Sequence, residues 1–350
     1  MKNLFDYATK ELSQDAFLRW LFENGFDESC ENVELKKIAR ELFDNFTGNE
    51  FKGKEIKELK TVAQWKKIDV SIWFKASGVE SLIVIEDKTG SREHNQLDNY
   101  NKEIEKHNSY WKGKPDYANK CNTRYVEAGK IFKIYYKTYA LNEQEKQTVE
   151  ENKWRIFGID EIFKVFSKYN STGVQILDDY IEHIKKIKIA ASNTQKPTEH
   201  STELDCVKWE AYFNNTVVPE LKKRVDKELI FSVYEPMFSY ICLNIEKEKN
   251  APYLEIRSRD SINGKLCLRI LCYGIYNENR EEKNEKVNSL FYEIRNNHKI
   301  FSQKYCKKNV QEKKQIGFIE HKDVFDEKEY IDKIVDGIFE YLKVMEKWGK

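Results

Sequence analysis

The chain has 350 residues, 40% of them hydrophobic and 34% charged, with a formal net charge of +1. This length is typical of two domains, and the hydrophobic content is enough for packed cores, which excludes a disordered protein. The sequence contains neither an apolar run of about 18 residues nor the apolar core of a signal peptide, so we expect a cytoplasmic protein with no membrane partner.

Cysteine and histidine patterns indicate neither disulfides nor zinc. The seven cysteines include no Cys-x-x-Cys pair, and the six histidines are scattered without ligand spacing. Charge is unevenly distributed: residues 1–50 hold 6 Lys/Arg against 11 Asp/Glu, net −5, whereas residues 51–150 hold 19 against 15, net +4. A local basic excess is compatible with a nucleic-acid substrate without arguing for one.

The first 67 residues are expected to form two helices and a strand. Apolar residues at helical spacing predict helices over 9–23 and 33–46, and the alternating segment 52–65 predicts a strand that enters a sheet. Lys66 and Lys67 follow this strand. They are candidates for binding a nucleic-acid backbone, and a solvated strand end is the equally weighted alternative.

Residues 69–88 predict a β-hairpin with charges at its open end. Val70 to Lys75 and Ser81 to Lys88 are β-branched and aromatic runs, separated by a predicted five-residue turn over 76–80. Glu86 and Lys88 share one face of the second strand, and Asp87 points to the other face. The antiparallel pairing of the strands is expected to bring Asp69 beside Glu86.

Two converging carboxylates need a neutralising partner, because like charges a few ångströms apart raise one another's pKa. A hard divalent cation, Mg²⁺ or Mn²⁺, accepts two carboxylates and takes its other ligands from water and phosphate. Lys88 is placed to orient or deprotonate an attacking water, or to stabilise charge growing on a phosphate.

The next segment predicts a helix, which is followed by an irregular loop. Gln96, Tyr100, Glu103 and His107 fall on one helical face. Trp111, Lys112 and Lys114 belong to the predicted loop 108–129, where aromatic rings and cations alternate. Such a mixture stacks on bases and contacts phosphates, although loop aromatics more often cap a core.

Asp69, Glu86 and Lys88, with Gln96 and Tyr100 shortly after, resemble the PD-(D/E)XK nuclease superfamily, in particular its RecB-like branch. The resemblance implies that Asp69, Glu86 and the backbone carbonyl of Asp87 bind metal, and that Lys88 is catalytic. It also implies that Gln96 and Tyr100 support the site. Ile68 stands where the family has proline.

The first helix carries a second resemblance. Glu11 and the residues after it, Leu-Ser-Gln-Asp-Ala-Phe-Leu-Arg-Trp-Leu, are similar to the start of a bacterial PD-(D/E)XK family of mostly unassigned role. This resemblance implies that Glu11 reaches the metal directly or through water. The alternative is an ordinary acid in a first helical turn, where the helix dipole favours it.

The remaining pattern completes an α/β domain over residues 1–190. It predicts strands over 131–139 and 154–159, and helices over 143–151, 161–168 (with Asp160 as N-cap) and 174–189. We expect a restriction-endonuclease-like mixed central sheet flanked by helices. A linker, 191–203, should precede a smaller α+β domain, 204–350.

The α+β domain is expected to contain helices over 207–218, 281–297 and 328–348 and strands over 229–234, 237–245, 253–258 and 266–273. Its basic run 304–314 is read as a solvated face, with nucleic-acid binding as the alternative. Target recognition and oligomerisation, through a homodimer or a partner protein, are both open roles.

Together these patterns and the resemblance predict a cytoplasmic Mg²⁺-dependent nuclease. The resemblance alone implies that it is a deoxyribonuclease, with DNA favoured over RNA, and that it acts in defence against foreign nucleic acid. Two alternatives stay open. One is a catalytically silent nucleic-acid- or protein-binding module on a nuclease fold, and the other is an RNA-directed nuclease.

Overall fold

The computed structural model describes most of the first half of the chain and separate segments of the second. The described residues are 3–6, 11–89, 96–114, 124–139, 141, 143–198, 202–224, 230–234, 240–244, 253–262, 265–275, 313–321 and 326–348. Close contacts divide the chain into two units, Met1–Ile189 and Ala190–Lys350. Residues 192–198, within the predicted linker, form neither helix nor strand.

The first unit contains a five-stranded mixed sheet in the order β1-β2-β3-β4-β5. The first three strands pair antiparallel, and β3, β4 and β5 pair parallel. The sheet is built from β1 (Ile56–Trp65), β2 (Ile68–Ala76), β3 (Val79–Lys88), β4 (Ile131–Lys137) and β5 (Arg155–Phe157). The predicted mixed sheet is confirmed.

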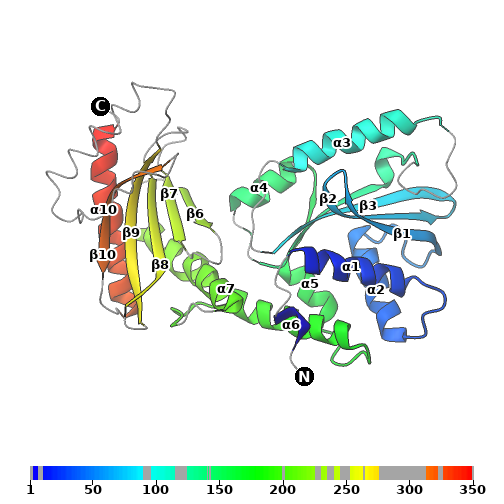
Figure 1. Ribbon diagram of the computed structural model, residues 1–350, viewed down its shortest axis with the longest axis horizontal. Helices are drawn as coiled ribbons and strands as arrows, with labels where there is room; N and C mark the ends of the chain where they lie inside the picture. The colour runs from blue at the N-terminus through cyan, green and yellow to red at the C-terminus, as the bar shows by residue number, and fades with distance from the viewer. Residues whose placement is uncertain are drawn as a thin grey trace. The chain divides into compact units, whose positions relative to one another are not determined.

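Helices cover both faces of this sheet, as Figure 1 shows. Those on one face are α1 (Glu11–Gly25), α2 (Val33–Phe46), α5 (Ile159–Phe166) and α6 (Gln175–Ala191). On the other face are α3 (Gln96–Trp111) and α4 (Glu143–Glu151). The described residues of the unit also include the short 3-10 turns η1 (Leu4–Asp6) and η3 (Ala128–Lys130). We call the two sides of the sheet the α1 face and the α3 face.

The continuous apolar runs of β2 and β3 follow from this double cover, because a strand buried on both faces needs no polar alternation. Ile83 and Ile85 pack into the core on the α1 face, and Leu82 and Val84 into the core on the α3 face. Helix α2 begins where the sequence predicts, and the side chain of Asn32 caps it by accepting the N–H of Leu35 at 2.8 Å.

Two local predictions are wrong. The turn between β2 and β3 has two residues, Ser77 and Gly78, instead of five, because Ala76 and Val79 already pair. Asp160 lies inside the first turn of α5, whose N-cap is Gly158, and Glu161 accepts the N–H of Gly158 at 3.1 Å. In both cases the strand or helix begins or ends beyond the residues whose periodicity predicted it: β2 and β3 extend into the predicted turn, and α5 begins before Asp160.

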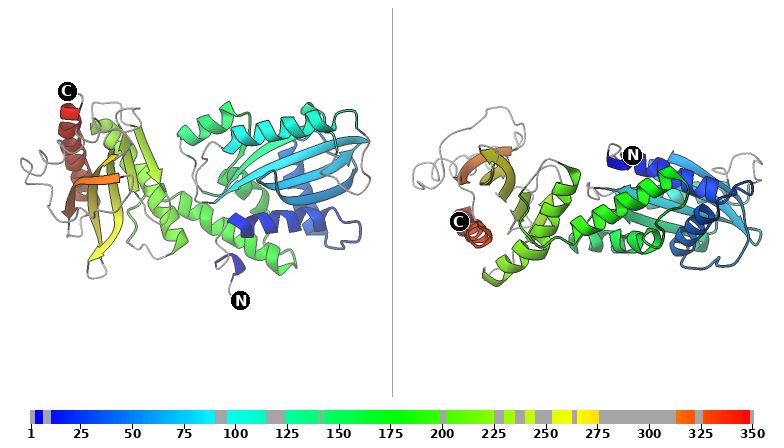
Figure 2. Two further views of the ribbon diagram at one scale, coloured as in Figure 1. Left: turned by 45° about the horizontal axis from the view of Figure 1, so that its top comes forward. Right: turned by 90° about the horizontal axis from the view of Figure 1, so that it is seen from below.

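The second unit contains an antiparallel five-stranded sheet in the order β10-β9-β8-β7-β6. Its strands are β6 (Ile230–Tyr234), β7 (Tyr240–Asn244), β8 (Tyr253–Ile262), β9 (Lys265–Ile275) and β10 (Lys313–His321). Its helices are α7 (Glu203–Tyr212), a π turn η4 (Phe213–Val217), α8 (Val218–Arg224) and α10 (Glu327–Trp348), which packs on β8 and β9. Figure 2 gives two further views of the elements.

Strand β10 was missed by the sequence analysis, which read residues 304–314 as a solvated basic run. Lys313 and Lys314 belong to this strand and pair with Ile275 and Gly274 of β9. The predicted helix 281–297 lies outside the described residues. Among the helices that the structure describes, none combines the length and apolarity that a membrane span requires.

Candidate active site

Asp69 and Glu86 are brought together by the strand register. Val70 pairs with Ile85, so the preceding Asp69 and the following Glu86 are opposite each other at the open end of the hairpin. Both side chains lie on the α3 face, because Val70 and Ile85 point to the α1 face. The Oδ2 atom of Asp69 also accepts the N–H of Asp87 at 2.9 Å.

Glu86 is a fully buried carboxyl group. Burial, and secondly the charge of Asp69, raise its pKa from an ordinary value of 4.5 to about 8, against the opposing effect of Lys88. Its Oε1 atom is 2.7 Å from the Nζ atom of Lys88. Its Oε2 atom is buried and receives no hydrogen bond from the described residues.

Lys88 lies on the α3 face together with Glu86, as the alternation of β3 predicts, and only 6% of it is exposed. The three charged groups that the sequence analysis singled out therefore converge. A buried ion pair flanked by a second carboxylate leaves one negative charge in excess when all three groups are ionised.

The side chain of Asp87 takes part in a separate polar cluster on the α1 face. Gln14 of α1 donates a hydrogen bond from Nε2 to Asp87 Oδ1. Nearby, the hydroxyl groups of Tyr136 and Tyr180 are 2.8 Å apart, and burial raises the pKa of both, with a further contribution from the charge of Asp87. Only the backbone of Asp87 thus remains for the predicted role at the metal site.

Glu11 is the first residue of α1, and its side chain lies outside the described residues. Gln14, one turn later on the same helix, contacts Asp87. The N-terminal end of α1 therefore lies at the edge of the sheet where β3 ends. The metal role of Glu11 stays a prediction.

Gln96 and Tyr100 lie in the first turns of α3, on the face that carries Glu86 and Lys88. The Nε2 atom of Gln96 donates to the hydroxyl of Tyr100 at 3.3 Å. Tyr100 is buried in the same core as Val84 and Tyr135. The pair is joined as the predicted helical spacing requires, and its supporting role stays a prediction.

The predicted nucleic-acid contacts fall into two groups. Lys66 and Lys67 form the exposed turn between β1 and β2, next to Asp69. Trp111, Lys112 and Lys114 lie at the other end of α3 from Gln96, which is about 23 Å away at about 1.5 Å per residue. The ammonium group of Lys114 lies 3.1 Å from the ring centre of Tyr110. The ring of Trp111 lies 6.4 Å from that of His107, which in turn lies 5.0 Å from the ring of Trp65, the residue before the β1–β2 turn. The nucleic-acid role of both groups stays a prediction.

Lys137 is a residue of the site that the sequence analysis missed. It pairs with Lys88 in the parallel register of β3 and β4, so both side chains point to the α3 face. Lys137 is buried and forms an ion pair with Glu145 of α4 at 3.4 Å, and Tyr135 donates a hydrogen bond to Glu145 at 2.5 Å. The sequence did contain a signal for Lys137, because this lysine ends the apolar strand β4 as Lys88 ends β3.

A divalent cation fits the donor set. Asp69 and Glu86 supply carboxylates, and the buried Oε2 atom of Glu86 has no geometric hydrogen-bond partner among the described residues. A hard cation such as Mg²⁺ accepts this kind of ligand. Within the described residues no group of three or more His, Cys, Asp or Glu side chains forms a metal cage. Two protein carboxylates match the way Mg²⁺ is held when phosphate and water complete its shell.

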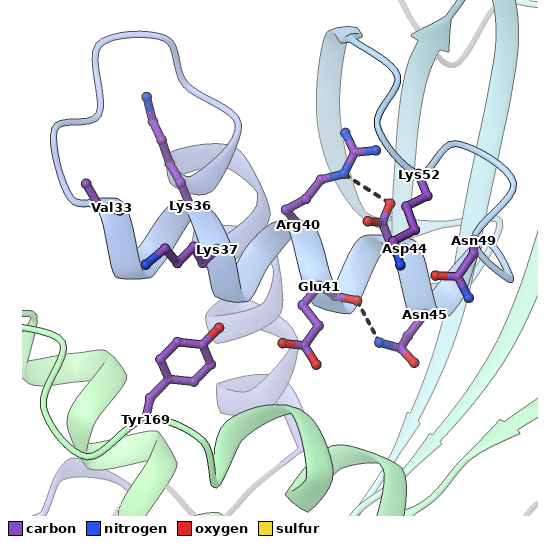
Figure 3. Close-up of a pocket in the computed structure, with 10 residues that line it drawn as sticks. All are labelled: Val33, Lys36, Lys37, Arg40, Glu41, Asp44, Asn45, Asn49, Lys52 and Tyr169. Atoms are coloured by element: carbon purple, nitrogen blue, oxygen red, sulfur yellow. Dashed lines mark hydrogen bonds and ion pairs between the residues drawn. The ribbon is translucent and has the colours of Figure 1, made fainter.

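A surface hollow of about 660 Å³ lies over α2, on the side of the sheet opposite to Glu86. Figure 3 shows Arg40 and Asp44 joined within it, at 3.0 Å. Arg40 also donates to the backbone carbonyls of Phe51 and Lys54. The guanidinium group of Arg40 is thus already held by an ion pair and two backbone hydrogen bonds. Because the hollow also lies on the other side of the sheet from Glu86, we do not include it in the candidate site.

No family model, curated protein or solved structure matches the chain in comparisons with known proteins.

Proposed function

We propose that the protein is a metal-dependent nuclease of the PD-(D/E)XK type that hydrolyses phosphodiester bonds of DNA. The observation that carries the proposal is the convergence of Asp69, Glu86 and Lys88 on one face of the sheet at the open end of one hairpin. The order of elements supports it: a helix, three antiparallel strands, a helix and a parallel strand are the core that we expect of a restriction-endonuclease-like fold.

In this proposal Asp69, Glu86 and the backbone carbonyl of Asp87 hold Mg²⁺ or Mn²⁺. A bound metal would lower the pKa of a water molecule and neutralise charge on the phosphate. Lys88, held by Glu86 at 2.7 Å, presents a fixed ammonium group that orients the attacking water or stabilises the developing negative charge. Gln96 and Tyr100 hold the rim of the site from α3.

DNA is preferred over RNA, and defence against foreign nucleic acid is the proposed setting, both from the resemblance. The second unit would recognise the target, or join a second copy or a partner protein.

A catalytically silent binding module is the second candidate, and burial favours it. Glu86 is 0% exposed and Lys88 6% exposed, so a phosphate reaches them only if neighbouring groups move aside. A module that binds nucleic acid through its surface alone would keep such a closed arrangement.

Plasmid cleavage separates the two candidates. Supercoiled DNA incubated with the protein and Mg²⁺ should be cut, and chelator should stop the reaction. Lys88→Ala should abolish cutting while circular dichroism shows a folded chain. Lys75→Ala is the matched control, because Lys75 lies on β2 near the other hairpin end, where it pairs with Glu58 and Glu80.

Three results would be decisive against parts of the proposal. A folded wild type that cuts neither DNA nor labelled RNA with any divalent metal supports the binding module. Preferential cutting of the RNA supports an RNA-directed nuclease. Cleavage retained by Lys88→Ala removes Lys88 from the mechanism.

A further inference from the structure

Two turns of the same sheet have the same length and the same backbone hand but differ in sequence. The β2–β3 turn consists of Ser77 and Gly78, with φ of 51° and 80°, and the β1–β2 turn consists of Lys66 and Lys67, with φ of 56° and 70°. Two-residue hairpin turns with positive φ at both positions favour Asn-Gly or similar pairs, because a Cβ atom is crowded there.

The lysine turn is the one next to the candidate site. Lys67 precedes Asp69 by two residues, whereas Ser77 follows the far end of β2, about 23 Å from Asp69 at about 3.3 Å per residue. The remote turn thus has a glycine at its second position, where positive φ costs little, whereas the turn beside the carboxylates has lysine at both positions.

Strain is concentrated just before Asp69. Of the seven non-glycine residues with positive φ in the described part of the chain, Gln64, Lys66 and Lys67 fall within the five residues that precede Asp69. Gln64 also donates a hydrogen bond from Nε2 to Asp69 Oδ1 at 3.0 Å. Unfavourable backbone conformations that cluster beside a candidate site favour a functional reason for their retention.

Both lysines are accessible to a ligand. They are exposed, and the only ion pair they form among the described residues joins Lys66 to Glu103 of α3 at 3.4 Å. That pair is solvent-exposed, so it contributes little and a phosphate can replace it. The turn therefore presents two positive charges at the rim of a site that carries Asp69 and Glu86.

We propose that Lys66 and Lys67 contact the phosphates of the nucleic-acid strand that reaches the site past Asp69, and that this contact is why lysines occupy a left-handed turn. The inference rests on the proposed nuclease function and identifies a substrate contact for it. It predicts that stability and affinity change in opposite directions when the turn is relaxed.

The test variant is Lys66→Asn with Lys67→Gly, which keeps the turn and removes both its strain and its charge. Lys66→Arg with Lys67→Arg keeps the charge. Lys36→Gln with Lys37→Gln is the control for net charge, because it removes two lysines from α2 on the opposite face of the sheet. DNA binding is measured in the Lys88→Ala background with Mg²⁺, so that the duplex stays intact, between about 50 and 200 mM KCl.

The relaxed variant should bind duplex DNA roughly tenfold more weakly at about 0.1 M salt, and the negative slope of log K against log salt should become shallower by about 2. Its Tm should rise by about 2–4 °C, because a relieved turn stabilises a domain of this size by that order. The arginine pair and the α2 control should keep the slope of the parent.

The outcomes separate this inference from the proposed function. A wild type that cuts DNA, combined with a relaxed variant that keeps the parental slope and affinity, overturns the lysine contact alone. A Tm that stays the same or falls overturns the strain argument. A wild type that neither cuts nor binds nucleic acid overturns the proposed function, and the inference with it.

Discussion

Replacing Glu86 with glutamine should make the metal-free protein more stable at neutral and alkaline pH. The pKa of Glu86 rises from 4.5 in the unfolded chain to about 8 in the folded protein, chiefly because the carboxyl is buried. Between these values the folded protein keeps a proton that the unfolded chain has lost. Its free energy of unfolding therefore falls as pH rises through this window.

The size of the effect follows from the shift. At about 1.4 kcal/mol per pH unit, the window corresponds to roughly 5 kcal/mol in full. A glutamine has no proton to lose, so the stability of Glu86→Gln relative to wild type should rise by about 4 kcal/mol between pH 5 and pH 8. Both causes of the shift, the burial of Glu86 and the charge of Asp69, lie within the site itself.

Urea unfolding in chelator at pH 5, 6, 7 and 8, followed by tryptophan fluorescence, measures the difference. Glu105→Gln, an exposed position on α3, is the matched control and should differ from wild type by no more than about 0.5 kcal/mol at each pH. A Glu86→Gln difference that does not change with pH would refute the claim that this carboxyl is held in an unfavourable environment.

Two further changes test the charged groups around the site. Asp69→Asn should weaken Mg²⁺ or Mn²⁺ binding about tenfold or more in calorimetry, because it removes one of two carboxylate ligands, and an unchanged affinity would count against Asp69 as a ligand. Lys137→Met should lower the free energy of unfolding by about 3–5 kcal/mol, because it leaves Glu145 buried without its cation. The double variant with Glu145→Gln should recover part of that loss in urea unfolding, and two strictly additive losses would show that the pair is not coupled.

Local periodicity was sufficient for the central sheet of the first unit. The apolar runs that became β2 and β3 are long, and their alternation placed Glu86 and Lys88 on the same face and Asp87 on the other. The observed two-residue turn then sets the register in which Asp69 meets Glu86, whereas the predicted five-residue turn would place Asp69 opposite Asp87. The roles of these residues stay predictions.

Long-range contacts were beyond the sequence pattern. Lys137 joins the site through the parallel register of β4 with β3, which depends on how the crossover helix α3 packs, so its position at the end of a strand could not by itself place it beside Lys88. Strand β10 was missed because its first two residues, Lys313 and Lys314, belong to a run of lysines whose charge indicated a solvated surface. Lys66 and Lys67 were predicted either to bind a nucleic-acid backbone or to form a solvated strand end, but their left-handed turn was not predicted, since propensity alone would have placed glycine or asparagine there.

The beginning of the first unit is tied to its last helix. The side-chain amide of Asn3 donates to the carbonyl of Asp179 at 2.7 Å, the N–H of Leu4 donates to the carboxylate of Asp179 at 2.9 Å, and Phe5 packs on Tyr180. Asn3 and Asp179 are 176 residues apart in the sequence, so this contact can form only after the whole stretch between them has been synthesised. Until α6 has emerged, the nascent chain exposes the aromatic surface of α1, so this unit should depend on chaperones during synthesis more than a fold closed by neighbouring segments.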